Sequence, residues 1–314
     1  MPASVDHAAG RWQEGTVSPV PLRTRMSAYW ELTKPRIVFL LLFTEVCAMV
    51  TAAHQVPITL QALSGVAGLA LTAGGSAALN MWYDRDIDRV MARTAHRPLP
   101  AGVVRPKAAL AWALVLGFLG VLILAVGTNL LAAALGLAGY LYYGVLYTMV
   151  LKRRTPQNIV IGGGAGAFPP LVGWAAVTGQ LSWAALGMFL LIFLWTPSHF
   201  WGLALYKRDE YARAGVPMMP VVRGEQSTQR QMGAYAVLLV LVSAALPFTV
   251  QLGWLYLGPA AIAGMWFLWI HVHLLRPGAQ TTYWAKRTFF ASLIYLPVVF
   301  GAMTLGALWP AAAI

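Results

Sequence analysis

The sequence predicts an all-α, polytopic membrane protein with nine transmembrane helices. Of its 314 residues, 59% are hydrophobic and only 10% are charged, which is a composition typical of membrane proteins. Nine windows of about twenty residues carry few or no charges, and this is the length that crosses a bilayer as a helix. The windows lie near 37–57, 59–82, 108–127, 129–150, 158–178, 183–205, 232–252, 255–274 and 288–309.

The basic residues give these nine helices an orientation. All 22 Lys and Arg residues fall before the first window or in every second connection, while the other connections, such as AAHQVPIT, carry no charge. Because Lys and Arg collect on the cytoplasmic side of inner-membrane proteins, we expect a protein of the bacterial inner membrane with its N-terminus in the cytoplasm. Residues 1–28 would form a cytoplasmic tail, and residues 29–314 a single transmembrane domain.

The net charge of +12 has an explanation in this topology. Basic residues on the inner side orient the helices and attract the anionic lipids of the bilayer. The charge is therefore no indication of nucleic-acid binding, and the predicted partner on that face is the lipid bilayer.

Acidic residues gather where the second window ends, in the stretch NMWYDRDIDR at 80–89. Asn80, Asp84 and Asp88 are spaced four apart, so their side chains share one face of a helix. An amide and two carboxylates are hard oxygen ligands of the kind that Mg²⁺ accepts. The alternative is a solvated helix end in which Arg85 and Arg89 neutralise the acids. Spacing and position favour the metal interpretation.

A second charged stretch follows the sixth window. YKRD at 206–209 repeats YDRD at 83–86, and each opens a long connection on the predicted inner side. The surrounding loops supply many cations. Carboxylates beside many cations suit a ligand that carries several negative charges together with its own divalent ion, a diphosphate above all. A lipid-tailed diphosphate would then lay its chain among the helices.

Several motifs resemble the UbiA superfamily of intramembrane aromatic prenyltransferases. Its first signature, Asn-x-x-x-Asp-x-x-x-Asp at the end of the second helix, matches Asn80, Asp84 and Asp88. Within the superfamily the chain is similar to the branch that farnesylates haem, over about residues 29–300. The stretches that carry this similarity are LTKPRI (32–37), RTAHRPLPAG (93–102), YTMVLKRRTPQNIVIGGGAGAFPPLVGW (147–174), TPSHFWGLALYKRDEYARAGVPMMPVV (196–222) and RTFFASLIYLP (287–297).

The resemblance implies an enzyme with a UbiA-type bundle and a site that faces the cytoplasm. It would transfer a farnesyl group from farnesyl diphosphate to the 2-vinyl group of haem b, with Mg²⁺ as cofactor, and give haem O for the biogenesis of terminal oxidases. A downstream haem A synthase or oxidase assembly factors would be further partners.

The resemblance also implies roles for individual residues. Asn80, Asp84 and Asp88 would act in catalysis by positioning the metal. Asp209 would be an indirect metal ligand, because the second acidic motif usual in the superfamily is reduced here to KRDEY. His199 and Trp201 would lie on the haem side. The diphosphate would be bound by Lys152 and Arg153, with Lys34, Arg36, Arg93, Arg97, Lys207 and Arg208 as further candidates.

Some features keep two interpretations. Tyr143 and Tyr147 suit either stabilisation of an allylic cation or anchoring at the membrane interface. Glu45, deep in the first window, is either functional or a protonated, hydrogen-bonded acid. A prenyltransferase for another aromatic or tetrapyrrole acceptor is one alternative function. A membrane transporter is another, although it would place ionisable residues near mid-membrane.

Overall fold

The computed structural model describes residues 21–276 and 280–309, and no β-strand occurs among them. The elements are α1 (Leu22–Leu32), α2 (Pro35–Ala53), α3 (Leu60–Tyr83), α4 (Arg85–Val90), α5 (Pro106–Gly127), α6 (Leu130–Leu141), the π-helix η1 (Tyr142–Leu151), α7 (Asn158–Gly162), α8 (Gly164–Thr178), α9 (Trp183–Tyr206), α10 (Arg208–Arg213), α11 (Met219–Val222), α12 (Gly224–Ala245), the 3₁₀-helix η2 (Leu246–Phe248), α13 (Gly253–Leu275) and α14 (Thr281–Leu308).

Nine helical segments within the described ranges are long and apolar enough to cross a membrane, which confirms the predicted number. Three of them are composite: α6 continues into η1, α7 into α8, and α12 into η2. The seventh and ninth segments begin at Gly224 and Thr281, several residues before the predicted 232 and 288. Hydropathy marks only the apolar part of a helix, whereas polar residues continue the same backbone hydrogen bonding beyond it.

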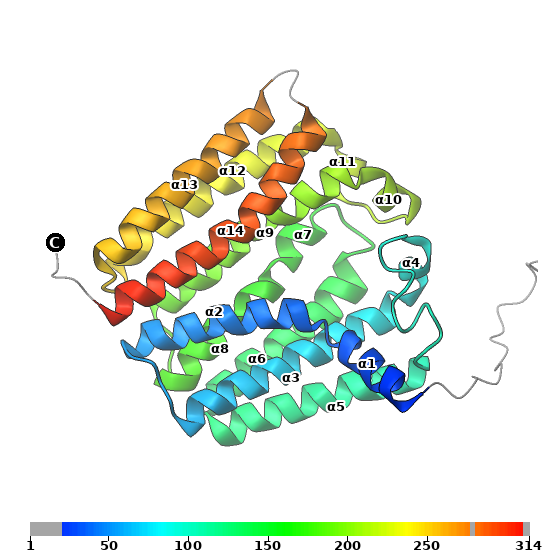
Figure 1. The fold of residues 1–314 in the computed structure, drawn as a ribbon, viewed down its shortest axis with the longest axis horizontal. Coiled ribbons are helices and arrows are strands. Elements are labelled where there is room, and N and C mark those ends of the chain that lie inside the picture. The colour runs from blue at the N-terminus through cyan, green and yellow to red at the C-terminus, as the bar shows by residue number, and fades with distance from the viewer. Residues whose placement is uncertain (1–20, 277–279, 310–314) are drawn as a thin grey trace, which may run out of the picture.

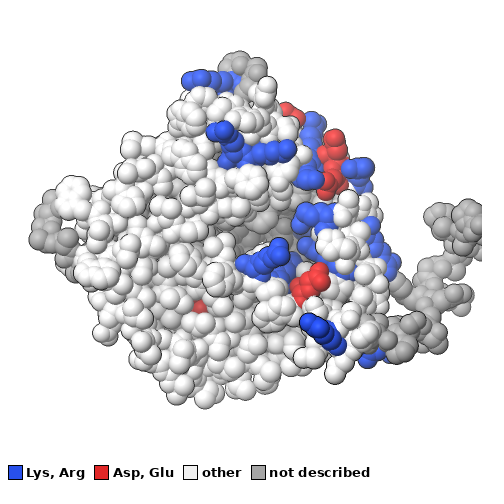
Figure 2. Space-filling model, in the orientation of Figure 1, with Lys and Arg blue, Asp and Glu red and all other residues white. Residues whose placement is uncertain are grey.

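The short helices α1, α4, α10 and α11 lie at one end of the bundle, on the right of Figure 1. Most of the Lys, Arg, Asp and Glu side chains visible in Figure 2 gather toward the same end. Helix α1 begins at Leu22, so the last part of the predicted tail is helical and packs through Ala28 and Leu32 against α3. The rest of the predicted tail, residues 1–20, lies outside the described residues.

Three spans begin with a side-chain cap after a short, uncharged connection. The N-cap residues Thr59, Asn129 and Ser182 each accept a hydrogen bond from the backbone N–H three residues later, at 2.9–3.2 Å. Such caps satisfy one of the N–H groups that a helix start leaves unpaired.

Helices α3 and α5 approach each other through glycines. A Cβ atom on Gly75 would lie 2.8 Å from the carbonyl oxygen of Ala113, and one on Gly120 would lie 2.7 Å from that of Gly68. Lipid tails are as apolar as side chains, so helices in a bilayer associate through close packing that small residues permit. This contact fixes α3, whose C-terminal end carries the acidic motif.

Candidate functional site

The predicted acidic motif lies at a break between two helices. Helix α3 ends at Tyr83, and α4 begins at Arg85. The backbone N–H of Asp84 donates to the carbonyl of Asn80 at 2.9 Å, and that of Asp88 donates to the carbonyl of Asp84 at 2.8 Å. The i, i+4 spacing therefore persists across the break, as the sequence predicted.

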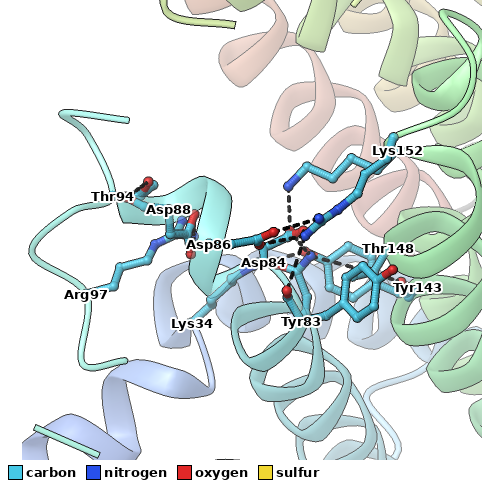
Figure 3. A network of polar contacts seen from close by, with 12 residues as sticks. Lys34, Tyr83, Asp84, Asp86, Asp88, Thr94, Arg97, Tyr143, Thr148 and Lys152 are labelled. Atoms are coloured by element: carbon cyan, nitrogen blue, oxygen red, sulfur yellow. Dashed lines mark hydrogen bonds and ion pairs between the residues drawn. The ribbon is translucent and has the colours of Figure 1, made fainter. Parts of the chain in front are cut away.

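The three motif side chains do not all face one point. The Asn80 amide donates to Asp84 Oδ2 at 2.7 Å, so these two residues form one group. Asp88 instead accepts from Nη1 of Arg97, at 2.9 Å to Oδ1 and 2.8 Å to Oδ2. Figure 3 shows Asp88 and Arg97 together on one side of α4, with Asp84 and Lys152 on the other.

Distant basic residues neutralise the acids. Lys152 Nζ lies 2.5 Å from Asp84 Oδ2. Arg153 Nη2 lies 2.7 Å from Asp86 Oδ1 and 3.6 Å from Asp84 Oδ1. The alternative interpretation assigns this role to Arg85 and Arg89. The Arg85 guanidinium instead donates to the Trp82 carbonyl at 2.6 Å. Buried carboxylates need such partners because an uncompensated charge in a dry site is costly.

Lys34 brings a further cation to the motif from the corner between α1 and α2. Its Nζ donates to Asn80 Oδ1 at 2.6 Å and to the Tyr143 hydroxyl at 3.0 Å. Burial, with Arg97 nearby, lowers the pKa of the Lys34 ammonium to about 7. An anionic ligand beside it would favour the charged form. Arg153 lowers the pKa of Asp86 through their hydrogen bond.

The backbone at Lys34 is strained. Its φ of 52° and ψ of 58° lie in the left-handed region, directly before Pro35. A non-glycine residue held in this region costs about 1–3 kcal/mol, and such residues cluster at functional sites. The hydrogen bonds of the Lys34 side chain to Asn80 and Tyr143 accompany this backbone conformation.

A π-helix shapes the opposite wall of the site. In η1 the hydroxyl of Thr148 donates to the carbonyl of Tyr143, five residues earlier, at 2.7 Å, and accepts from the Asn80 amide at 3.0 Å. The backbone N–H of Lys152 donates to the carbonyl of Tyr147, also five residues earlier. The wider turn brings Thr148 and Lys152 toward α3. Such π-helical segments are rare and occur often at functional sites.

A mostly apolar cavity of about 360 Å³ extends from Lys34 into the bundle. Tyr143 and Tyr147 line it, and their rings stack with centroids 5.6 Å apart and planes 9° apart. His199 also lines it. The volume lies within the range of small-molecule sites, which are mostly apolar with a few placed polar groups. One cavity therefore joins the charged end to the interior.

The polar groups that Lys34 joins to the cavity fit a divalent cation. Asp84 Oδ1 is buried and has no hydrogen-bond partner. The neighbouring Asn80, which donates to Asp84 Oδ2, contributes an amide oxygen. Among residues 21–276 and 280–309, no three His, Cys, Asp or Glu side chains gather into a metal site. Mg²⁺ suits such a sparse site, because it binds through one or two carboxylates and takes substrate phosphates and waters as its other ligands.

Some predicted site residues are not brought to this position. Asp209 is exposed on α10, and among the described residues no hydrogen bond or ion pair joins its carboxylate to the motif, so the structure gives no basis for its role as a metal ligand. Lys207 pairs with Glu210 at 2.5 Å, and Arg208 with Glu225 at 3.5 Å. The repeat of the first motif does not form a second acidic site. Tyr211 stands where the first motif has an acid, and it lies in the same core cluster as Ile87.

Three other predicted site residues lie at different places relative to the cavity. Trp201 is fully buried, packs edge-on against Tyr235 and shares a core cluster with Ile159. It is not among the residues that line the cavity, and its place on the haem side stays a prediction. Arg36 lines the cavity. Arg93 is exposed beside Tyr211, on the side of α10.

Glu45 lies inside the bundle and is fully buried. Neither carboxylate oxygen has a hydrogen-bond partner. No described residue therefore serves as the hydrogen-bond partner of Glu45, and the residue is not among those that line the cavity.

Comparisons with known proteins agree with this geometry. The sequence model of the UbiA prenyltransferase family matches residues 40–312. A relative from Symbiobacterium thermophilum named "Protoheme IX farnesyltransferase" is 53% identical over 277 residues, which are 88% of this chain and 93% of the relative.

Solved structures share the fold. The structure described as that of digeranylgeranylglyceryl phosphate synthase superposes with a TM-score of 0.77 at 20% identity, over 91% of this chain and 99% of that one. A UbiA homolog from Archaeoglobus fulgidus bound to DMAPP and Mg²⁺ superposes with a TM-score of 0.60 at 15% identity, over 88% and 99%. By its sequence, and with a fold of the same type, the chain belongs to the UbiA prenyltransferase family.

Proposed function

We propose that this chain transfers a farnesyl group from farnesyl diphosphate to the 2-vinyl group of haem b and so forms haem O. The observation that carries the proposal is a charged cluster of Asn80, Asp84, Lys152 and Lys34 beside an apolar cavity, which Lys34 and Tyr143 both line. A prenyl diphosphate has the same division into a charged head and an apolar tail. The relatives that carry the name protoheme IX farnesyltransferase support this choice of substrates.

Lys152, Arg153 and Lys34 would bind the diphosphate as charge-assisted donors, with Arg97 as a further cation of the same group. Asn80 and Asp84 would hold Mg²⁺, which neutralises charge on the leaving diphosphate. Asp88 would orient Arg97. The homolog from Archaeoglobus fulgidus, described as bound to DMAPP and Mg²⁺, supports the use of a divalent metal with a prenyl diphosphate.

In the reaction the allylic C–O bond breaks, and its electron pair leaves with the diphosphate. The terminal vinyl carbon of haem forms the new C–C bond, and the oxygen of a water molecule adds to the other vinyl carbon and loses a proton. Fixed cations stabilise the leaving charge. The faces of Tyr143 and Tyr147 would stabilise the developing allylic cation, and the apolar walls exclude other water molecules.

The charge distribution supports a location in the bacterial inner membrane with the charged cluster toward the cytoplasm. The charged end of the bundle carries α1, α4, α10 and α11 (Figure 1), and basic residues favour the cytoplasmic side. The product, a haem with a long apolar tail, would stay in the bilayer and pass to a haem A synthase or to oxidase assembly factors.

The direct test incubates the purified protein with haem b, farnesyl diphosphate and Mg²⁺ and detects farnesylated haem by mass spectrometry. We expect chelation of divalent ions, or Asp84→Asn, to abolish the product. The matched control is Asp209→Asn, which changes an exposed acid and should retain activity. Absence of product with the wild-type protein, but release of a solute from loaded vesicles, would favour a transporter. Formation of product only with another aromatic or tetrapyrrole acceptor would identify a different prenyltransferase.

A further inference from the structure

His199 on α9 is held with both faces of its ring covered. Trp195 stacks on it with ring centroids 4.3 Å apart and planes 15° apart, and Phe289 from α14 stacks on it at 4.8 Å and 25°. Phe200 contacts it edge to face at 5.1 Å. An imidazole between two aromatic faces can present only its edges to a ligand, and His199 lines the cavity.

Hydrogen bonding decides which nitrogen of His199 carries the proton. The Ser292 hydroxyl donates to the carbonyl of Phe289 at 2.6 Å, which uses its single proton. Nδ1 of His199 lies 2.7 Å from Ser292 Oγ, so Nδ1 is the donor and Ser292 Oγ the acceptor. Nε2 then carries a lone pair, and no described residue hydrogen-bonds to it. A histidine that donates through one nitrogen and leaves the other free has the arrangement of a metal ligand.

The neighbouring histidine has a different arrangement. His271 is buried, with Nδ1 2.8 Å from the Phe267 carbonyl and Nε2 3.2 Å from Ser198 Oγ. Both of its nitrogens are therefore engaged within the bundle. Of the histidines in the described part of the chain, His199 alone lines the cavity.

The surroundings of His199 limit the chemistry of its ligand. Near it the cavity walls are apolar, with Ile192, Leu293 and Leu296 among them. A free divalent cation there would lack a compensating charge and would be costly. Iron in a porphyrin brings its own anionic ring and a flat apolar surface. Gly166 lines the cavity, and a Cβ atom added there would meet nothing within 4 Å, so the cavity is open at this position.

We propose that Nε2 of His199 is an axial ligand of the iron of the acceptor haem, and that Ser292 is the positioning residue that keeps this nitrogen free. The inference rests on the proposed function, since it takes haem as the acceptor. Ligation fixes the haem in the same cavity that Tyr143 and Tyr147 line, and so limits the positions that its vinyl group can reach.

The test measures haem binding in the absence of any prenyl diphosphate. Purified full-length protein in lipid nanodiscs is titrated with ferric haem b and followed by absorption and electron paramagnetic resonance spectra. The wild type should give a histidine-ligated spectrum. His199→Ala should lose that spectrum, and added imidazole should restore it. His199→Met keeps a side chain of similar length and should give a spectrum with a different axial ligand. Ser292→Ala should weaken binding by about tenfold or more, as loss of a ligand's supporting hydrogen bond does.

His273, which is half-buried on α13 and does not line the cavity, supplies the control His273→Ala, and this variant should bind haem as the wild type does. An unchanged spectrum and affinity in both His199 variants would overturn the inference. If those variants still form farnesylated haem, the proposed function stands without the inference about His199. If they bind haem normally but form no product, His199 acts on a proton and not on iron. If the wild type neither binds nor farnesylates haem, the proposed function itself fails.

Discussion

Replacing Lys152 by glutamine should leave Asp84 as a buried carboxylate with too little positive charge around it. The Asp84 side chain is fully buried, and that of Lys152 is 16% exposed. Removing one partner of a buried ion pair costs about 3–5 kcal/mol. We expect the lower end of this range, because Arg153 lies 3.6 Å from Asp84 Oδ1 and compensates in part.

The reverse change, Asp84→Asn, should cost less, about 1–2 kcal/mol, because it removes hydrogen-bond acceptors but leaves no buried anion. The double variant has two neutral amides at these positions and should be more stable than Lys152→Gln alone. The expected coupling between Lys152 and Asp84 is therefore about 2 kcal/mol or more. Addition of Mg²⁺ should reduce the loss in Lys152→Gln, since the ion neutralises the same carboxylate.

The assay is unfolding in mixed detergent micelles with a chelator present, followed by tryptophan fluorescence, for the wild type, both single variants and the double variant. The control is Lys207→Gln, which breaks a pair whose side chains are 38% and 17% exposed and should cost less than about 1 kcal/mol. Strictly additive losses for Lys152→Gln and Asp84→Asn would refute the argument that this pair is a buried, coupled unit.

Three further predictions concern packing. Gly166→Leu should fill open space in the cavity and reduce prenyl transfer without unfolding the protein. The control Gly258→Leu, also in open space but away from the cavity, should retain transfer. Equal activities of the two variants would contradict the position of the cavity. Gly75→Ala should lower the free energy of unfolding by about 1–3 kcal/mol, because its Cβ would meet backbone atoms of α5 at 2.8 Å; unchanged stability would show that α3 and α5 can separate. Glu45→Met should be neutral or stabilising, because it removes a buried acid that has no hydrogen-bond partner; a clear drop in Tm would mean that the carboxyl group makes an interaction essential to the fold.

The nine spans could be predicted from the sequence because length and charge are local properties of a segment. An apolar run of about twenty residues must form a helix in lipid, where each backbone polar group needs a partner within its own segment. The same reasoning misplaced the starts of α12 and α14, whose first turns are polar. The contact between Asn80 and Asp84 was also local, since it follows from their i, i+4 spacing.

The sequence by itself therefore determined the membrane fold, the end of the bundle that carries charge and the position of the acidic motif. Only the tertiary structure decided which cations meet these acids, because Lys34 and Lys152 lie 46 and 68 residues from their partners in the chain. It also turned Asp88 toward Arg97, left Asp209 exposed and set the tautomer of His199 through Ser292 of another helix. Each of these outcomes depends on how distant helices pack, and residue spacing within one helix does not specify that packing.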